Sequence, residues 1–292
     1  MNAAVAGTFS CVARDAATGE LGVAVQSKFF AVGAVVPWLR AGVGAVATQS
    51  WANVAYGPEA LRRMAAEAPA HEVLEHLVAS DPGRDVRQVG IVDRRGRSAA
   101  HTGTRCLPWA GHRTGEGWAC LGNILAGERV VAGMADAYCG ASGRLPERLL
   151  AALQAGQAEG GDRRGMQSAA LIVVRESGGF GGRNDRYLDL RVDDDPVPIE
   201  ELARLLRVFR ASPYDPDFTG TIPLAGDVVT IAQAVLTNLG LYAGPVDGRA
   251  SPPLWNALEK FHERYGFAAE WLGGEALSRR AHLKLRELFE LG

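Results

Sequence analysis

The chain has 292 residues, of which 47% are hydrophobic and 22% are charged, and its formal net charge is −2. This composition supports a folded core and excludes a wholly disordered protein. The near-neutral charge argues against binding to nucleic acid through bulk electrostatics. No apolar run approaches the roughly 20 residues that span a bilayer, so we expect neither a nucleic-acid partner nor a membrane association.

The start of the chain bears on the cellular location, and the spacing of the cysteines bears on metal binding. Residues 1–7 lack a basic segment followed by a sustained apolar stretch, so we predict no signal peptide and a cytoplasmic location. The four cysteines show no C-x₂-C spacing and the six histidines are dispersed. We therefore expect no metal site and no cofactor.

The first predicted element is a β-hairpin. Residues 8–14 and 21–28 are rich in residues that favour strands, and Asp and Gly punctuate the turn between them. Symmetric closure of this hairpin pairs Thr8 with Ser27, but a slip of one residue would change which side chains share a face.

Helices and strands follow up to about residue 210. In chain order we expect strand 43–49, helices 58–64 and 70–78, strands 89–93 and 97–101, helices 127–138 and 146–158, strands 168–174 and 187–192, and helix 198–209. Strands at both ends of a helical middle favour an α+β layered sandwich.

A change in composition separates a second domain. Residues 211–226 are rich in Pro, Gly, Asp and Thr, as is typical of a linker. Helical periodicity then resumes and predicts a small all-α domain with helices at 227–239, 253–265 and 274–291. The expected organisation is a leader or propeptide at 1–7, a first domain at 8–210, the linker, and a three-helix domain at 227–292.

The dipeptide Gly7-Thr8 is the best candidate for chemistry. A threonine that becomes an N-terminus carries a hydroxyl nucleophile and an α-amine with a pKa near 8, which can act as the base. Glycine before it leaves the scissile carbonyl sterically accessible. Lys28, at the end of the return strand, is placed to lower the pKa of both groups. The structural alternatives are an ordinary threonine at a strand start and a solvated lysine.

Four segments resemble one bacterial family, catalogued as domain of unknown function 1028. The similarity extends over about residues 8–210, and its motifs lie at 8–15, 19–33, 122–127 and 161–169. The resemblance implies a fold like that of the N-terminal-nucleophile (Ntn) hydrolases, a four-layer αββα sandwich with two stacked antiparallel sheets between helical layers. The family's activity is not established, so the resemblance implies a reaction only by analogy.

This chain departs from the family at its start. Members commonly begin Met-Thr-Phe-Ser, so that removal of the initiator Met exposes the threonine. Here seven residues precede Thr8, and Asn2 is too bulky for efficient removal of Met1. Only cleavage between Gly7 and Thr8 would therefore release the amine.

Other polar residues are candidates to complete a site. Gly122 and Asn123 offer the backbone N–H and amide groups that stabilise an oxyanion, although a tight turn is the structural alternative. Candidates for substrate binding lie after the strand at 43–49 and before the strand at 168–174, where a salt-bridged loop is the alternative for the second group. They are Gln49, Asn53, Asp162, Arg163 and Gln167.

The C-terminal segment is similar to a peptidoglycan-binding-like three-helix domain. The pattern is Ile231-x₂-Ala234-Val235-Leu236-x₂-Leu239-Gly240-Leu241-Tyr242-x-Gly244-Pro245-Val246-Asp247-Gly248, followed by Trp255-x₂-Leu258-x₂-Phe261. Asp247 is placed to accept hydrogen bonds from neighbouring backbone amides. The three apolar residues recur at helical spacing and are expected in the core rather than in a sugar-stacking platform. The usual Gly-rich turn is replaced by residues 249–253. A cell-wall fragment is a candidate partner.

The sequence indicates two candidate functions. The first is an amidohydrolase acting on a small, unidentified amide or peptide after cleavage at Gly7-Thr8. In it Thr8 attacks, Lys28 tunes its pKa, Ser27 relays or orients, and Gly122 with Asn123 holds the oxyanion.

The alternative is a non-catalytic Ntn-like scaffold whose C-terminal module binds a glycan or a peptide. A third reading, a hydrolase with Ser10 or Cys11 as nucleophile, is disfavoured because Cys11 faces away from Thr8 and is expected to be buried. Association into a homo-oligomer is also open, but the sequence indicates no interface residues.

Overall fold

A computed structural model describes residues 7–179, 182–212, 215 and 220–291. The predicted leader lies outside these residues except for Gly7. Packing divides the chain into two compact units, with the boundary between Arg204 and Leu205 inside helix α5 (Pro198–Arg210). The N-terminal unit is a mixed α/β structure with two antiparallel sheets.

The larger sheet has six strands in the order β10-β9-β2-β1-β8-β7. These strands are β1 (Thr8–Arg14), β2 (Leu21–Ser27), β7 (Gly111–Gly115), β8 (Trp118–Asn123), β9 (Ser168–Val174) and β10 (Arg186–Val192). The predicted hairpin register is confirmed, because Thr8 pairs with Ser27 in an antiparallel ladder. Strand β1 is internal and has β8 on its other side.

The smaller sheet has four strands in the order β3-β4-β5-β6. They are β3 (Pro37–Arg40), β4 (Gly44–Ser50), β5 (Arg87–Asp93) and β6 (Ser98–Thr102). Its face packs on the larger sheet through an apolar cluster that includes Val12, Val25, Ala45 and Leu121. Burial of this cluster by both sheets contributes to the stability of the unit.

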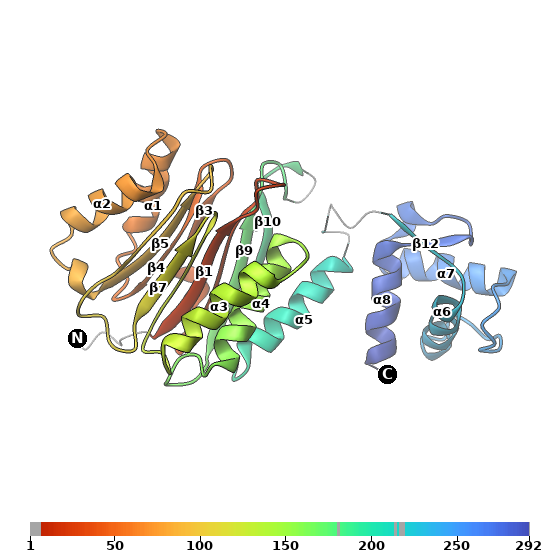
Figure 1. The fold of residues 1–292 in the computed structure, drawn as a ribbon. Helices are drawn as coiled ribbons and strands as arrows, with labels where there is room; N and C mark the ends of the chain where they lie inside the picture. Colours follow the sequence, from red (N-terminus) through yellow and green to blue (C-terminus); the bar gives the residue numbers. More distant parts are fainter. Residues whose placement is uncertain (1–6, 180–181, 213–214, 216–219, 292) are drawn as a thin grey trace. The chain divides into compact units, whose positions relative to one another are not determined.

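Helices cover the outer faces of the two sheets (Figure 1). Helices α1 (Tyr56–Ala65) and α2 (Ala70–Ser80) pack on the four-stranded sheet. Helix α4 (Leu145–Ala158) packs on β1 and β2 of the six-stranded sheet and contacts α3 (Glu128–Gly140), which packs on β8. This arrangement leaves the end of the inter-sheet layer at Thr8 bordered by loops.

The C-terminal unit contains the three predicted helices, α6 (Asp227–Asn238), α7 (Pro252–Arg264) and α8 (Arg279–Glu290). The expectation of an all-α domain is wrong, because β11 (Thr221–Pro223) and β12 (Ala276–Ser278) form an antiparallel pair. Strand β11 lies in the predicted linker and β12 in the first turn of the last predicted helix. Both strands have only three residues, too few for a periodic signal.

The core of this unit includes the residues that the helical spacing indicated. Leu258 and Phe261 are fully buried, and Trp255 packs against the same cluster. Asp247 accepts a hydrogen bond of 3.0 Å from the backbone N–H of Arg249, as predicted, and a second from Gln233 Nε2.

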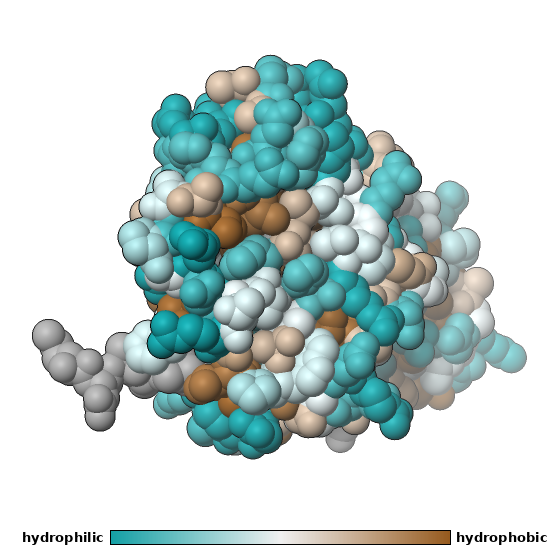
Figure 2. All heavy atoms as spheres, turned by 60° about the vertical axis from the view of Figure 1, so that its left-hand side comes forward, coloured by the Kyte–Doolittle hydropathy of each residue, from teal (hydrophilic) through white to brown (hydrophobic). Residues whose placement is uncertain are grey.

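The outer surface is mixed in character. On the face shown in Figure 2, hydrophobic residues appear as separate small patches among hydrophilic ones. In the described part of the chain, no helix combines the length and the apolar character needed to cross a membrane.

Candidate active site

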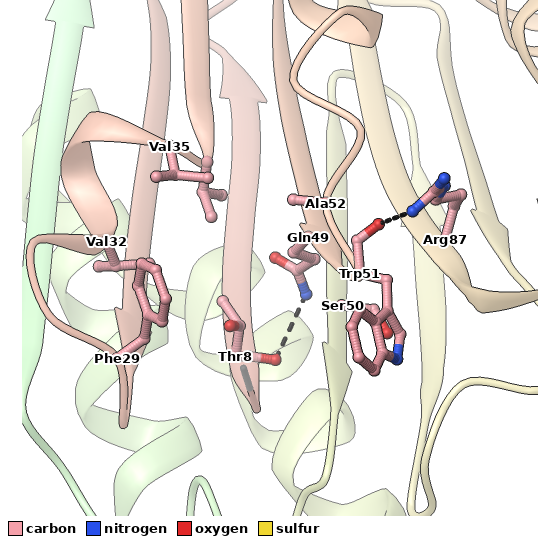
Figure 3. A pocket seen from close by; sticks show the side chains of 10 residues that line it. Thr8, Phe29, Val32, Val35, Gln49, Ser50, Trp51, Ala52 and Arg87 are labelled. Carbon is pink, nitrogen blue, oxygen red and sulfur yellow. Dashed lines mark hydrogen bonds between the residues drawn. The ribbon is translucent and has the colours of Figure 1, made fainter. Parts of the chain in front are cut away.

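Thr8 lies at the wall of a cavity between the two sheets. The cavity measures about 240 Å³ and is lined by Thr8, Phe29, Val32, Val35, Val36, Gln49, Ser50, Trp51, Ala52 and Arg87. Thr8 is the first residue of β1, and the residue is 1% exposed. In Figure 3 the rings of Phe29 and Trp51 lie on opposite sides of it.

The carbonyl oxygen of Gly7, just before this threonine, accepts two hydrogen bonds. The Ser27 hydroxyl donates at 2.5 Å and the Arg164 guanidinium donates at 3.0 Å. Ser27 Oγ also lies 3.1 Å from Thr8 Oγ1. A serine hydroxyl has a single proton. Since Ser27 gives that proton to Gly7, the Thr8 hydroxyl must be the donor in its contact with Ser27.

Arg164 is held in place by a buried carboxylate. Its guanidinium donates to both oxygens of Asp162, at 3.1 and 2.8 Å, and the Asp162 side chain is fully buried. The same carboxylate accepts the backbone N–H groups of Arg164 and Lys28. These two parallel hydrogen bonds restrict the rotation of the planar Arg164 guanidinium, so the guanidinium is held pointing toward Gly7.

Gly7 has no room for a side chain. A Cβ built on it would lie 2.8 Å from both carboxylate oxygens of Asp162 and 2.9 Å from Arg164 Nη2. Glycine is therefore required here by the close approach of the charged pair, and the backbone carbonyl reaches Arg164 because the residue has no side chain.

A network of buried amides lies on the other side of Thr8. Gln49 Nε2 donates to the Thr8 carbonyl at 3.3 Å (Figure 3) and to Gln88 Oε1 at 2.8 Å. Gln88 Oε1 also accepts Asn123 Nδ2, and Gln88 Nε2 donates to the Gly122 carbonyl at 2.8 Å. Asn123 pairs with Thr8 in the ladder, and its Oδ1 is buried without a partner among the described residues. Gln88 joins the two sheets at this point.

Three of the five described non-glycine residues with positive φ lie at or after strands β2, β4 and β8. Ala31, Ser50 and Ile124 have φ values of 52°, 67° and 54°, in the left-handed region that non-glycine residues avoid. Ser50 ends β4, Ile124 directly follows β8, and Ala31 lies in the loop after β2. Such strain persists only where the surrounding structure holds it, and it is common at functional sites.

Arg87 lines the cavity but has partners in the protein. It donates to Asp81 Oδ2 at 2.9 Å and to the Trp51 carbonyl at 2.5 Å. Burial opposes the charge of Asp81, but hydrogen bonds from Arg87 and Asn53 outweigh that effect and hold its pKa well below the usual range. The pair is therefore a stable ion pair beside the cavity.

The structure brings together only some of the predicted site residues. Thr8, Ser27, Asn123 and Gln49 meet at the end of β1, whereas Gly122 lies opposite Phe9 with its carbonyl bonded to Gln88. Asp162 is close to the site, but it holds Arg164 and the Lys28 backbone rather than facing the cavity.

Four predicted residues make their contacts elsewhere. The Lys28 ammonium is exposed and donates to the Met166 carbonyl, and Asn53 donates to Asp81 without lining the cavity. Arg163 is exposed, and Gln167 donates to Asp194. The cation that contacts Gly7 is Arg164, the neighbour of the predicted Arg163, because the turn after Asp162 reverses the chain direction.

Sequence reasoning missed Arg164, Gln88, Phe29, Trp51 and Arg87. The segment Asp162-Arg163-Arg164-Gly165 did carry a signal, since an Asp two residues before an Arg and a following Gly favour a charged turn. Gln88 carried no such signal, because it lies just before the predicted strand 89–93, where a polar residue is ordinary. Among the described residues, no three His, Cys, Asp or Glu side chains converge to hold a metal ion.

Comparisons with known proteins place this unit in a family. The family model described as "Family of unknown function (DUF1028)" matches residues 8–202. The crystal structure of protein SPO2555 from Silicibacter pomeroyi, described as DUF1028, is similar with a TM-score of 0.65 and 28% identity. The match covers 71% of this chain and 88% of that one. Comparison with curated proteins gives no match. The chain therefore belongs to the DUF1028 family.

Proposed function

We propose that this protein is an N-terminal-nucleophile amidohydrolase that cleaves its own Gly7–Thr8 bond and then hydrolyses a small amide or peptide. The observation that carries the proposal is the pair of donors, Ser27 and Arg164, on the carbonyl oxygen of Gly7. The helical layers on the outer faces of two stacked antiparallel sheets support it, since this is the arrangement expected of Ntn hydrolases.

The first step is attack of Thr8 Oγ1 on the Gly7 carbonyl carbon. The Thr8 proton passes to Ser27 Oγ while the Ser27 proton passes to the Gly7 oxygen, so that no strong base is needed. Arg164 polarises the carbonyl and stabilises the partial negative charge on this oxygen until the Ser27 proton arrives. The proton on the Gly7 oxygen is then transferred to the Thr8 nitrogen, so that the Gly7 carbonyl re-forms as the bond between the Gly7 carbon and the Thr8 nitrogen breaks.

The second step is hydrolysis of the resulting ester between Gly7 and Thr8 by water. It releases a carboxylic acid on Gly7 and restores the hydroxyl of Thr8. The new α-amine has a pKa near 8, so a fraction of it is neutral at pH 7 and can serve as the base for external substrates. An amide substrate would follow the same course, with acyl transfer to Thr8 and then deacylation.

The proposal rests on the N-terminal unit. In the C-terminal unit, Trp255 packs against the apolar core. This aromatic ring is therefore not displayed as a platform for sugar stacking, and we assign the unit no separate activity.

Intact mass and N-terminal sequencing of the freshly purified protein test the proposal. We expect loss of residues 1–7, retention of the full chain in Thr8→Ala, and cleavage in Thr8→Ser, which keeps the hydroxyl. Arg163→Ala is a matched control for handling and proteolysis. A folded wild-type chain that retains its leader after prolonged incubation would show that the proposal is wrong.

A further inference from the structure

We infer that the cavity beside Thr8 accepts the uncharged, apolar acyl group of the amide substrate; this rests on the proposed function. The walls are mostly aliphatic and aromatic and include Val36. Val32 and Val35 lie on one side, and Phe29 and Trp51 flank the threonine (Figure 3). An acyl group bound among these side chains has its carbonyl carbon near Thr8 Oγ1.

The charged and amide groups in the cavity wall are already paired. Gln49 uses Oε1 for the Ser10 hydroxyl at 2.6 Å and Nε2 for Gln88 and the Thr8 carbonyl. Arg87 is bonded to Asp81 and to the Trp51 carbonyl. A carboxylate or ammonium on the acyl group would therefore meet no unpaired charge among Gln49 and Arg87. The Ser50 hydroxyl, buried in the wall without a partner among the described residues, offers only a neutral hydrogen bond. Burial of the charge is therefore unfavourable.

The volume sets the size of this group. About 240 Å³ is below the roughly 300–1,000 Å³ of sites that bind drug-sized ligands. The cavity therefore fits a compact acyl group, such as a branched aliphatic or phenylacetyl group, and excludes a folded peptide segment. Each buried methylene is worth about a fourfold gain in kcat/KM until the space is filled.

The test compares 4-nitroanilides of matched acyl groups on the cleaved protein. The series is acetyl, butanoyl, 4-methylpentanoyl, phenylacetyl and succinyl. Succinyl has the shape of 4-methylpentanoyl but carries a carboxylate. We expect kcat/KM to rise from acetyl to 4-methylpentanoyl and to fall at least about 100-fold for succinyl. A flat series, or succinyl equal to its apolar counterpart, would overturn the inference.

A cavity variant adds a structural test. Val35 is half-buried and lines the cavity, so Val35→Phe should shift the preference toward acetyl. The matched control is Val54→Phe, at an exposed position outside the cavity, which should leave the acyl preference unchanged. An unchanged preference in Val35→Phe counts against the assignment.

Binding separates this inference from the proposed function. If the wild-type chain keeps its leader and hydrolyses no anilide, the proposed function fails. Ligand-observed NMR on full-length Thr8→Ala then compares 4-methylpentanamide with succinamate. Preferential binding of the apolar amide, lost in Val35→Phe, supports the cavity assignment on its own. Equal binding of the two, or binding of neither, overturns it.

Discussion

The Arg164 guanidinium donates a 3.0 Å hydrogen bond to the carbonyl oxygen of Gly7, although 157 positions separate the two residues. The contact exists because Asp162 fixes the guanidinium and because Gly7 lacks a side chain. A cation on a peptide carbonyl polarises that bond toward attack. This pair therefore links the loop before β9 to the chemistry proposed at the start of β1.

Replacing Arg164 should slow self-cleavage without abolishing the fold. Loss of one oxyanion donor typically costs about 10²–10³-fold in rate. Arg164→Ala should show that loss in a time course of intact mass, and Arg164→Lys should recover part of the rate because it keeps the charge. Arg163→Ala, at the exposed neighbouring position, should mature at the wild-type rate. Equal rates for the Arg164 and Arg163 variants would remove Arg164 from the mechanism.

Adding a single methyl group at Gly7 should block maturation. The Cβ would meet the Asp162 carboxylate at 2.8 Å, so either Gly7 or the Asp162–Arg164 pair must shift, which disturbs the hydrogen bond from Arg164 to the Gly7 carbonyl. We expect Gly7→Ala to accumulate as the full chain. The control is Gly127→Ala, where a Cβ would meet nothing within 4 Å and φ is extended. Normal cleavage of Gly7→Ala would contradict the packing described for this residue.

Gln88 should contribute strongly to stability. Its side chain bonds Gln49, Asn123 and the Gly122 carbonyl in a buried layer between sheets. Truncation leaves these partners unsatisfied, at about 1–3 kcal/mol for each buried group. Gln88→Ala should therefore lower the free energy of unfolding by more than about 2 kcal/mol in denaturant titration. Gln167→Ala, whose amide bonds Asp194 near the surface, should lower it far less.

Acidification should destabilise the C-terminal unit through His262. Burial lowers its pKa below the ordinary value, and Nδ1 donates to the Leu258 carbonyl at 2.7 Å. The folded state therefore keeps the ring neutral, whereas the unfolded chain takes up a proton below about pH 6.5. The contribution of the neutral His262 ring to the free energy of unfolding is fully present above that pH. It is lost as the pH decreases toward the folded-state pKa.

Thermal unfolding of the full chain between pH 7.5 and 5 checks this prediction. In His262→Gln, the pH dependence of the C-terminal transition should be smaller. It should not vanish, because burial also lowers the pKa of His282. His71→Gln, at an exposed position, is the control and should keep the wild-type slope. An unchanged slope in His262→Gln would show that this ring does not govern the transition.

The sequence was sufficient to predict most of the fold. Symmetric closure of a hairpin around the turn predicted the pairing of Thr8 with Ser27, which the structure confirms, and the apolar spacing of Leu258 and Phe261 indicated a helical core. These predictions succeeded because periodicity and turn chemistry are local. Strands β3, β7 and β8 were missed. The residues of β7, Gly111–Gly115, are polar and half-buried or exposed, and Gly122 with Asn123, for which a tight turn was the structural alternative, lies in β8.

The site was only partly predictable for a different reason. Thr8 and Ser27 follow from one hairpin, but the contact between Arg164 and Gly7 depends on the conformation of a distant loop. Sequence spacing cannot choose between Arg163 and Arg164 until the turn after Asp162 is known. The position of Gln88 likewise requires the stacking of two sheets, which no local pattern specifies.

The internal position of β1 has a consequence for any new chain end created at Thr8. A fresh terminus usually frays, yet this one is clamped on both sides by β2 and β8. Cleavage just before Thr8 would leave the pairing of β1 with β2 and β8 intact. The released heptapeptide would diffuse away while Thr8 stays held in the sheet. Cleavage at Gly7–Thr8 would therefore be irreversible.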